Sequence, residues 1–268
     1  MTPKDMEQAP ALHVRRLGTG PMAALALHCG LGTSGMWKGV AGSLDDSVTL
    51  TAPDFPGHGR SAPFRDQGDV HDQACDAVRG LFEPGMHLIG HSFGATVALR
   101  LALEHPGRAA SVSLIEPVFF AAARGRDGFD AHRAREEAFF GVYQGGDMMQ
   151  AAQVFHDIWG GGIPWDRFPS AVQKDMARGM PFVAATEPSL WADLHGLLAK
   201  GGLEALRCPV TLIRGAQTVP MIALVHGGLM DRLPNAREMV IDGAGHMLSV
   251  THPDQVAQAI LGTMRSAT

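Results

Sequence analysis

Short apolar runs alternate along the chain with longer stretches of helical periodicity. The runs have the length and β-branched character of strands and lie at 23–27, 48–51, 86–89, 112–115, 210–213 and 239–241. Strands that alternate with helices usually pair in parallel, because each crossover returns the chain to the same end of the sheet. The pattern therefore predicts an α/β fold, in which a mostly parallel central sheet is covered by helices on both faces.

The strand pattern is interrupted between residues 117 and 200. Helical stretches are expected there at 131–143, 147–159, 170–180 and 188–200, with glycine-rich breaks between them. A block of helices between two strands of a parallel sheet is typical of an inserted subdomain. We therefore predict a core formed by residues 1–116 and 201–268, and an inserted helical cap formed by residues 117–200.

The composition is that of an ordinary folded protein. The 268 residues are 46% hydrophobic and 18% charged, and the net charge of −5 without a basic cluster argues against a nucleic-acid partner. No apolar run approaches the length of a membrane span, and residues 1–10 lack the apolar core of a signal peptide. Cys29, Cys75 and Cys208 have neither metal-ligand spacing nor a disulfide framework. We expect a cytoplasmic protein that binds a small-molecule substrate, needs no metal or organic cofactor and contacts no membrane; a homodimer is left open.

One serine lies between two glycines in the motif Gly90-x-Ser92-x-Gly94. The apolar run 86–89 enters this motif, and a stretch of helical periodicity leaves it and stops before Pro106. This context predicts a nucleophile elbow, a strand-to-helix turn so tight that the flanking residues must be small. The serine would then stand at a helix N-terminus, where developing negative charge is stabilised. The alternative is a glycine-rich turn with a solvated serine.

Three further motifs follow predicted strands. They are His28-Cys29-Gly30-Leu31-Gly32, the segment from Asp54 to Ser61, and Gly243-Ala244-Gly245-His246. With the elbow, they resemble the α/β-hydrolase superfamily in order and spacing, over nearly the whole chain outside the cap. The resemblance implies that Ser92 is the nucleophile and His246 the general base, with an oxyanion hole made by the backbone N–H groups of Gly30 and Phe93. Cys29 stands where the family often has glycine, and we expect a packed, unreactive thiol there.

The acid of the expected Ser-His-acid set is its least regular member. In most relatives it follows a late strand, three residues after a glycine, but here that position holds Thr218, which cannot carry a negative charge. Glu116 directly follows the run 112–115. It resembles the acid of relatives, including some haloalkane dehalogenases, in which this group has moved to the end of that strand. Pro117 disfavours helical geometry in the residue before it, so we expect extended backbone at Glu116.

Other arrangements of the carboxylates are also consistent with the sequence. Glu116 could instead pair with an arginine at the start of the cap, such as Arg124 or Arg126. Asp231 and Asp242 are rival acids, the first expected at the end of a surface helix and the second in the turn that precedes the catalytic histidine. Our hypothesis is that Glu116 completes the set.

Aromatic residues gather between 117 and 200. Phe119, Phe120 and Trp159 are the residues that we expect to line an apolar substrate pocket above Ser92. The alternative is that most of the rings in this segment form the cap's own core, since a small helical unit needs one.

A serine at the elbow points to acyl transfer, because the dehalogenases and epoxide hydrolases of this superfamily use aspartate there. We therefore predict a serine hydrolase of the carboxylesterase or lactonase kind. It would cleave a small, largely apolar carboxylic ester, lactone or thioester through an acyl-enzyme. The alternatives are a carbon–carbon bond hydrolase acting on a dienoic or diketone substrate, a cofactor-free oxygenase, and a catalytically silent ligand-binding protein.

Overall fold

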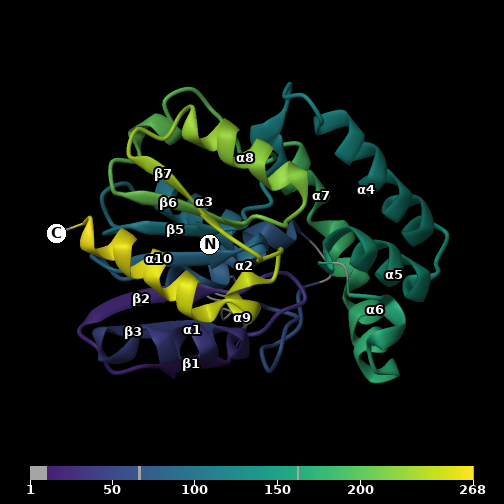
Figure 1. Cartoon of the computed structure of the whole chain (residues 1–268), viewed down its shortest axis with the longest axis horizontal. Coiled ribbons are helices and arrows are strands. Elements are labelled where there is room, and N and C mark those ends of the chain that lie inside the picture. The colour runs from purple at the N-terminus through teal and green to yellow at the C-terminus, as the bar shows by residue number, and fades with distance from the viewer. Residues whose placement is uncertain (1–10, 66–67, 162, 268) are drawn as a thin grey trace, which may run out of the picture.

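A single sheet crosses the molecule (Figure 1). The computed structural model describes residues 11–65, 68–161 and 163–267, and within them the sheet has seven strands. The strands are β1 (Val14–Leu17), β2 (Met22–Leu27), β3 (Val48–Pro53), β4 (His87–His91), β5 (Val112–Ile115), β6 (Val210–Gly215) and β7 (Ala236–Ile241). Their order is β1-β3-β2-β4-β5-β6-β7, with β1 antiparallel to β3 and the other pairs parallel. The predicted α/β fold is confirmed.

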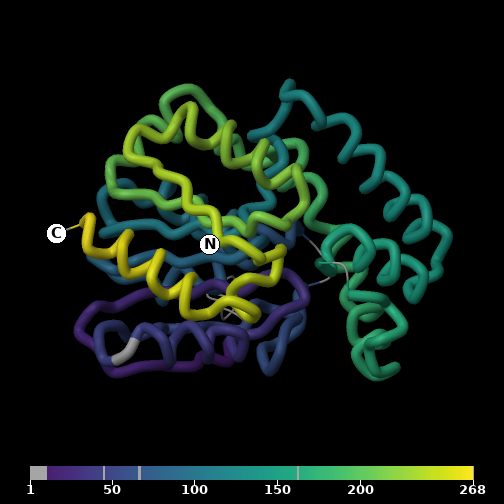
Figure 2. Tube along the Cα trace, viewed as in Figure 1, coloured from purple at the N-terminus to yellow at the C-terminus, as the bar shows by residue number. Residues whose placement is uncertain are grey.

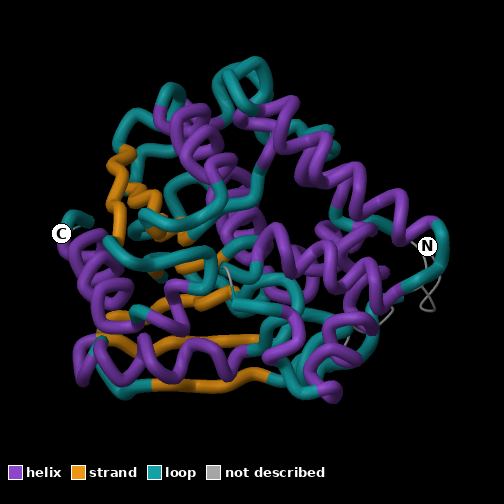
Figure 3. The backbone as a smooth tube through the Cα atoms, turned by 45° about the vertical axis from the view of Figure 1, so that its right-hand side comes forward, coloured by secondary structure: helices purple, strands orange, loops and turns teal. Residues whose placement is uncertain are grey.

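Helices cover both faces of the sheet (Figure 3). Successive side chains of a strand point to opposite faces, so each strand packs against helices on both sides. Leu88 and Leu114 share one core with α2 (Val70–Arg79), α3 (Phe93–Glu104) and α8 (Pro220–Met230). Ile89 and Ile115 share the other with α1 (Lys38–Ser43), the 3₁₀ turn η1 (Ser34–Trp37), α9 (Leu248–Thr251) and α10 (Pro253–Arg265). A second 3₁₀ turn, η2 (Asp45–Ser47), follows α1. Consecutive residues of one strand thus enter opposite cores, as a sheet buried on both faces requires.

Between β5 and β6 the chain leaves the sheet and forms a helical insertion (residues 120–205), teal to green in Figure 2. It contains α4 (Phe129–Gln144), α5 (Met148–Trp159), α6 (Ser170–Ala185) and α7 (Glu187–Trp191), with 3₁₀ turns η3 (Phe120–Ala123), η4 (Trp165–Arg167) and η5 (Leu203–Ala205). Buried Phe139, Ala151 and Met180 give α4, α5 and α6 a small core of their own. Among the helices described, in this insertion or elsewhere, none is long and apolar enough to cross a membrane.

Two elements differ from the sequence prediction. The helix expected over 188–200 ends at Trp191. Asp193 adopts a φ of 55°, and its carboxylate accepts hydrogen bonds from the backbone N–H groups of Leu197 and Leu198; such bonds compete with helix formation. Strand β1 was not predicted, because half of its four residues are arginine and it lies at the edge of the sheet, where little apolar surface is buried.

The turn between β4 and α3 depends on the absence of side chains at two positions. A Cβ atom on Gly94 would collide with the carbonyl oxygens of Leu27 and His28. One on Gly90 would collide with the backbone of Ala95. The loop after β2 therefore lies directly against the N-terminus of α3, backbone to backbone.

This contact gives a test of the fold. Alanine has the higher helix propensity, yet Gly94→Ala is expected to destabilise the protein by about 1–3 kcal/mol or more, since neither carbonyl can move away without breaking the sheet. Gly80→Ala, at the C-terminal end of α2, meets no atom within 4 Å and is the matched control. Urea unfolding measures both variants; a stable Gly94→Ala protein would contradict the close approach.

Candidate active site

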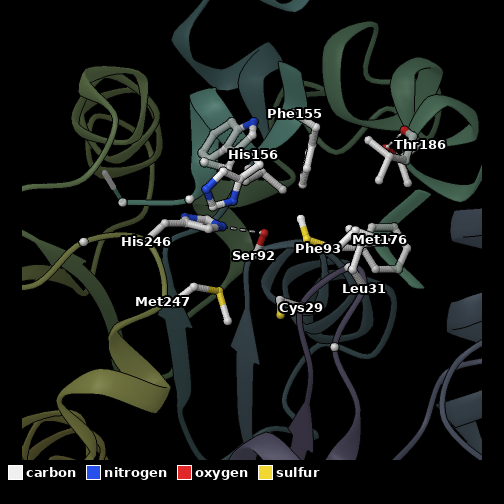
Figure 4. Close-up of a pocket in the computed structure, with 18 of the residues that line it drawn as sticks. Cys29, Leu31, Ser92, Phe93, Phe155, His156, Met176, Thr186, His246 and Met247 are labelled. Carbon is white, nitrogen blue, oxygen red and sulfur yellow. Dashed lines mark hydrogen bonds between the residues drawn. The ribbon is translucent and has the colours of Figure 1, made fainter. Parts of the chain in front are cut away.

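Ser92 stands at the turn between β4 and α3 with strained backbone. Its φ is 55° and its ψ is −116°, a conformation that non-glycine residues rarely adopt. The N–H of Ser92 donates a hydrogen bond to the carbonyl of Ile115 on the neighbouring strand, which continues the β4–β5 pairing past the end of β4. Its Oγ lies 3.1 Å from Nε2 of His246, the contact drawn as a dashed line in Figure 4.

His246 lies in the loop between β7 and α9 and is positioned from several sides. Its Nδ1 lies 2.9 Å from Oε2 of Glu116. Its backbone carbonyl accepts a hydrogen bond of 2.8 Å from Nε2 of His91. The indole of Trp159, from the helical insertion, packs over its ring with 4.8 Å between centroids. The imidazole is thus oriented between a hydroxyl and a carboxylate, with a tryptophan covering it.

Glu116 follows β5 and is completely buried. Its Oε1 accepts the backbone N–H of Gly215 at 2.8 Å, and its Oε2 accepts the hydroxyl of Thr218 at 2.5 Å as well as facing His246. Thr218, at the position where the resemblance led us to expect an acid, here donates to the carboxylate of Glu116. A buried carboxylate with donors on both oxygens is stabilised in its charged form.

The backbone at Glu116 corrects one expectation. The φ of Glu116 is 50°, in the left-handed region, and the extended conformation predicted from Pro117 is wrong. The N–H of Glu116 donates to the carbonyl of Ile213 on β6, and the side chain must also reach Gly215 at the end of that strand. These tertiary hydrogen bonds outweigh the local preference of the residue before a proline.

The alternative carboxylate arrangements are not those of the structure. Arg124 donates to the carbonyl of Trp191, and Arg126 forms an ion pair with Asp231 at the end of α8. Asp231 and Asp242 are both exposed, and Asp242 lies in the turn after β7 as expected. The carboxylate that meets the histidine is that of Glu116.

Two other histidines near the site are structural. His28 accepts the backbone N–H of Phe55 at 2.9 Å, and His91 supports the loop of His246. Burial lowers the pKa of both His28 and His91 to about 3, and in each case a neighbouring histidine adds to the effect. Both rings are therefore neutral, and they place no positive charge beside His246.

The two predicted oxyanion donors lie side by side. A Cβ atom built on Gly30 would be 3.9 Å from that of Phe93. Neighbouring Leu31 has a φ of 61°, and its N–H points away to Nε2 of His58 at 3.3 Å. Gly30 and Phe93 both line the cavity in which Ser92 lies.

That cavity has a volume of ≈ 580 Å³ and a mostly apolar wall. The sheet side contributes Ser92, His246 and Cys29, and Figure 4 shows Phe155, His156, Met176 and Thr186 of the insertion facing them. Phe120 and Trp159 line the cavity as predicted. Phe119 does not: its side chain is 1% exposed and packs in the main core, because the 3₁₀ turn that begins at Phe120 directs the two adjacent rings to different places.

Several polar residues of the cavity wall, Glu136 among them, were not predicted from the sequence. Glu136, on α4, is 5% exposed and lines the cavity, and its Oε1 accepts the indole N–H of Trp159 at 3.0 Å. Its burial raises its pKa to about 7. The helical period could have found it, since Glu136 shares one face of α4 with His132 and Phe139, both of which are buried.

A second group of ionisable residues lies apart from Ser92. Ligand atoms of Asp69, Asp72 and His195 lie within 4.8 Å of one another, close enough to hold a metal ion. Those atoms already have partners: Asp69 caps α2 through the N–H groups of His71 and Asp72, and its other oxygen accepts the hydroxyl of Ser189. The group joins the end of the insertion to α2.

One family of known proteins matches most of the chain. Residues 24–259 match the model of the alpha/beta hydrolase family. The chain belongs to this family. It is 28% identical to the pimeloyl-[acyl-carrier protein] methyl ester esterase of Nitrosomonas europaea, over 91% of this chain and 96% of that one. The protein of the same name from Aeromonas hydrophila is 29% identical, over 93% and 98%.

Solved structures of the family share the fold of this hydrolase. The esterase EaEST from Exiguobacterium antarcticum superposes with a TM-score of 0.66 at 16% identity, covering 96% of each chain. A bromoperoxidase from Bacillus anthracis superposes with a TM-score of 0.71 at 18% identity, again over 96% of each chain. Identities this low establish the architecture and leave the reaction to be argued from the site.

Cys29 gives a first test of the site. Its thiol is buried beside Met36, and burial raises its pKa to about 12, so almost no thiolate forms at neutral pH. N-ethylmaleimide is expected to leave Cys29 and Cys75 of the native protein unmodified and to react first at half-buried Cys208. Peptide mapping before and after denaturation measures this; rapid native labelling of Cys29 would show that the thiol is activated.

Glu136 gives a test that depends on pH. Its folded-state pKa of about 7 lies above the ordinary value of 4.5, so the unfolded chain releases this proton first. The stability that Glu136 contributes must therefore fall as the pH rises from 4.5 to about 7, and must stay low above that. Glu136→Gln does not titrate, so its melting temperature should rise relative to wild type across this interval. Glu137→Gln, on the exposed neighbour, is the control, and parallel pH profiles for all three proteins would contradict the assignment.

Proposed function

We propose that this protein is a serine hydrolase that cleaves a small, largely apolar carboxylic ester, lactone or thioester through an acyl-enzyme on Ser92. The observation that carries the proposal is the continuous path from the Ser92 hydroxyl through His246 to buried Glu116. The esterase names of the two relatives that match this chain over nearly its full length support an ester as the substrate.

The proposed reaction uses each member of this path. His246 takes the Ser92 proton at Nε2 while Oγ attacks the carbonyl carbon of the substrate. Glu116 keeps the proton on Nδ1 and stabilises the imidazolium that forms. His246 then returns its proton to the leaving oxygen or sulfur, the bond to the acyl group breaks, and the acyl-enzyme remains. A water molecule, deprotonated by the same histidine, releases the carboxylic acid and restores Ser92.

The backbone N–H groups of Gly30 and Phe93 are the proposed oxyanion hole. Gly30 lies in the loop after β2, and Phe93 is the first residue of α3, whose N-terminus adds its own positive potential. Donors of this kind contribute about 3 kcal/mol each to transition-state stabilisation in measured cases. The close contact at Gly94 restricts the distance between loop and helix, which supports an oxyanion hole that is formed before the substrate arrives.

The helical insertion (residues 120–205) largely coincides with the proposed cap, which comprises residues 117–200. The proposed core comprises residues 1–116 and 201–268. The insertion supplies Phe120, Trp159 and most of the apolar wall of the cavity. A cavity of ≈ 580 Å³ suits a small ligand with a short acyl or aryl group.

Removal of the nucleophile or of the acid tests the proposal. Ser92→Ala is expected to abolish hydrolysis of p-nitrophenyl and methyl esters and to prevent labelling by a fluorophosphonate, read by intact mass. Glu116→Gln is expected to lower kcat by about 10⁴-fold, because a neutral amide favours the wrong histidine tautomer. Ser170→Ala and Glu137→Gln, both exposed on the insertion, are the matched controls.

The outcomes separate the reactions that the fold could host. Loss of ester hydrolysis and of labelling in Ser92→Ala, with folding intact by circular dichroism, supports the acyl-enzyme. Full activity of Glu116→Gln would exclude it as the triad acid. A folded wild-type protein that hydrolyses no ester and takes no label, but cleaves a diketone or consumes oxygen with an aromatic substrate, would overturn the proposal.

A further inference from the structure

The charged groups of the cavity wall are all of one sign. Two glutamates, Glu136 and Glu187, line the cavity. None of the described residues that line it is an aspartate, a lysine or an arginine. Glu187 forms an ion pair of 2.9 Å with Arg133, which lies outside the wall. One arginine beside two glutamates leaves a negative charge uncompensated whenever Glu136 is ionised.

Glu136 is also incompletely paired. Its Oε1 accepts the Trp159 indole, and Oε2 has no hydrogen-bond partner among the described residues. The nearest basic side chain on its own helix, His132, lies 3.6 Å from Oε1 with its Nε2 buried and without a hydrogen bond. Burial lowers the pKa of His132 to about 4, so this ring is neutral and does not balance the carboxylate. A side chain that is 5% exposed thus has one carboxyl oxygen without a protein donor at the wall of the cavity.

Aromatic rings surround this carboxyl. The ring of Phe120 is tilted against that of Trp191, with 4.5 Å between centroids, and against that of Trp159, with 5.9 Å. All three rings line the cavity beside Glu136. Aromatic faces attract cations and give nothing comparable to an anion, so the rings and the carboxyl favour the same kind of ligand.

We propose that this end of the cavity is a subsite for an ammonium group carried by the substrate, with Glu136 as the residue that determines this specificity. The inference rests on the proposed ester hydrolysis, since it names the substrate class of the same site. The ammonium would donate to the free oxygen of Glu136 and lie against the rings of Phe120 and Trp159. A substrate that ends in a carboxylate is disfavoured at this position, because no lysine or arginine lines the described wall.

The distances make the subsite compatible with the reaction. Trp159 donates to Glu136 at 3.0 Å and packs over His246 at 4.8 Å, so about one indole ring separates the carboxyl from the catalytic histidine. A short alkyl chain spans that interval. The preferred substrate is therefore an ester of an ω-amino acid with a few methylene groups between the carbonyl and the nitrogen.

The preference should increase with pH. The ionisable groups around Glu136 are His132 on its own helix, Arg133, and Glu187 on α7. The first is neutral above pH 4 and the other two are paired, so of these groups Glu136 is the one that changes charge as the pH passes about 7. His156, His246 and His252 also line the cavity, and the comparison with Glu136→Gln separates their effect from that of Glu136. A primary ammonium stays protonated until about pH 10, as a lysine does.

Four methyl esters test the subsite. Methyl heptanoate, methyl ω-hydroxyhexanoate and methyl ω-aminohexanoate have chains of equal length, and the monomethyl ester of heptanedioic acid adds a carboxylate at the far end. Wild type is expected to favour the ammonium ester by kcat/KM, with the hydroxyl ester intermediate and the monomethyl ester of heptanedioic acid poorest. In Glu136→Gln the ratio of ammonium to alkyl ester should fall about ten-fold or more. The glutamine can still accept the Trp159 indole, so the packing is kept, and Glu137→Gln should keep the wild-type ratio.

A binding measurement separates this inference from the catalytic one. Hexylammonium is titrated against the intrinsic fluorescence of wild type and Glu136→Gln, with hexanoate as the anionic counterpart. Tighter hexylammonium binding to wild type, strengthening from pH 6 to pH 8 as the carboxyl of pKa about 7 ionises, supports the subsite even where no ester is cleaved.

The contrary results are equally clear. Equal hexylammonium affinity in wild type and a folded Glu136→Gln protein, or a wild-type preference for the alkyl ester, overturns the subsite and leaves the proposed hydrolysis intact. Failure of every ester with hexylammonium binding preserved overturns the hydrolysis alone. If Glu136→Gln does not fold, pH-independent hexylammonium binding to wild type gives the same negative answer.

Discussion

Burial of the Glu116 carboxylate is the constraint on which the site depends. A charge removed from water costs several kcal/mol unless the protein supplies donors for it. Here those donors come from the end of β6, through the Gly215 backbone and the Thr218 hydroxyl, and from His246 after β7. The ends of three neighbouring strands must therefore be in register before the carboxylate can be buried at all. Orientation of His246 is a consequence of that requirement.

The same register supports strained backbone. Ser92 and Glu116 both have positive φ, which costs of order 1–3 kcal/mol for each residue. Each donates its N–H to the next strand, Ser92 to Ile115 and Glu116 to Ile213, so the sheet pairing continues one residue beyond the strands into the strained positions. Hydrogen bonds of the parallel sheet thus hold the hydroxyl and the carboxylate in conformations that an isolated turn would leave.

Features of this protein that depend on local structure could be predicted from the sequence, and features that depend on tertiary contacts could not. Six of the seven strands, the elbow and the position of Glu116 could be predicted, because apolar runs and small residues report local structure directly. The φ of Glu116 could not, since distant donors on β6 determine it. Phe119 and Phe120 are adjacent and chemically identical, and the turn between them decides which one reaches the cavity. The helical spacing of Glu136 from Phe139 could have indicated a buried position, but only the packing of α4 shows that Glu136 lines the cavity.

Trp159 connects the insertion to the chemistry of the sheet. One indole donates its N–H to Glu136 and presents its ring to His246, so the position of α5 affects the carboxyl that we propose as the ammonium site and the imidazole that would move the proton. An ammonium bound at Glu136 would compensate the negative charge of the buried carboxylate, which is unfavourable when it has no positive partner. Substrate recognition would then stabilise the placement of the ring that covers His246. The insertion would then be part of the proposed catalytic arrangement and not merely a cover over it.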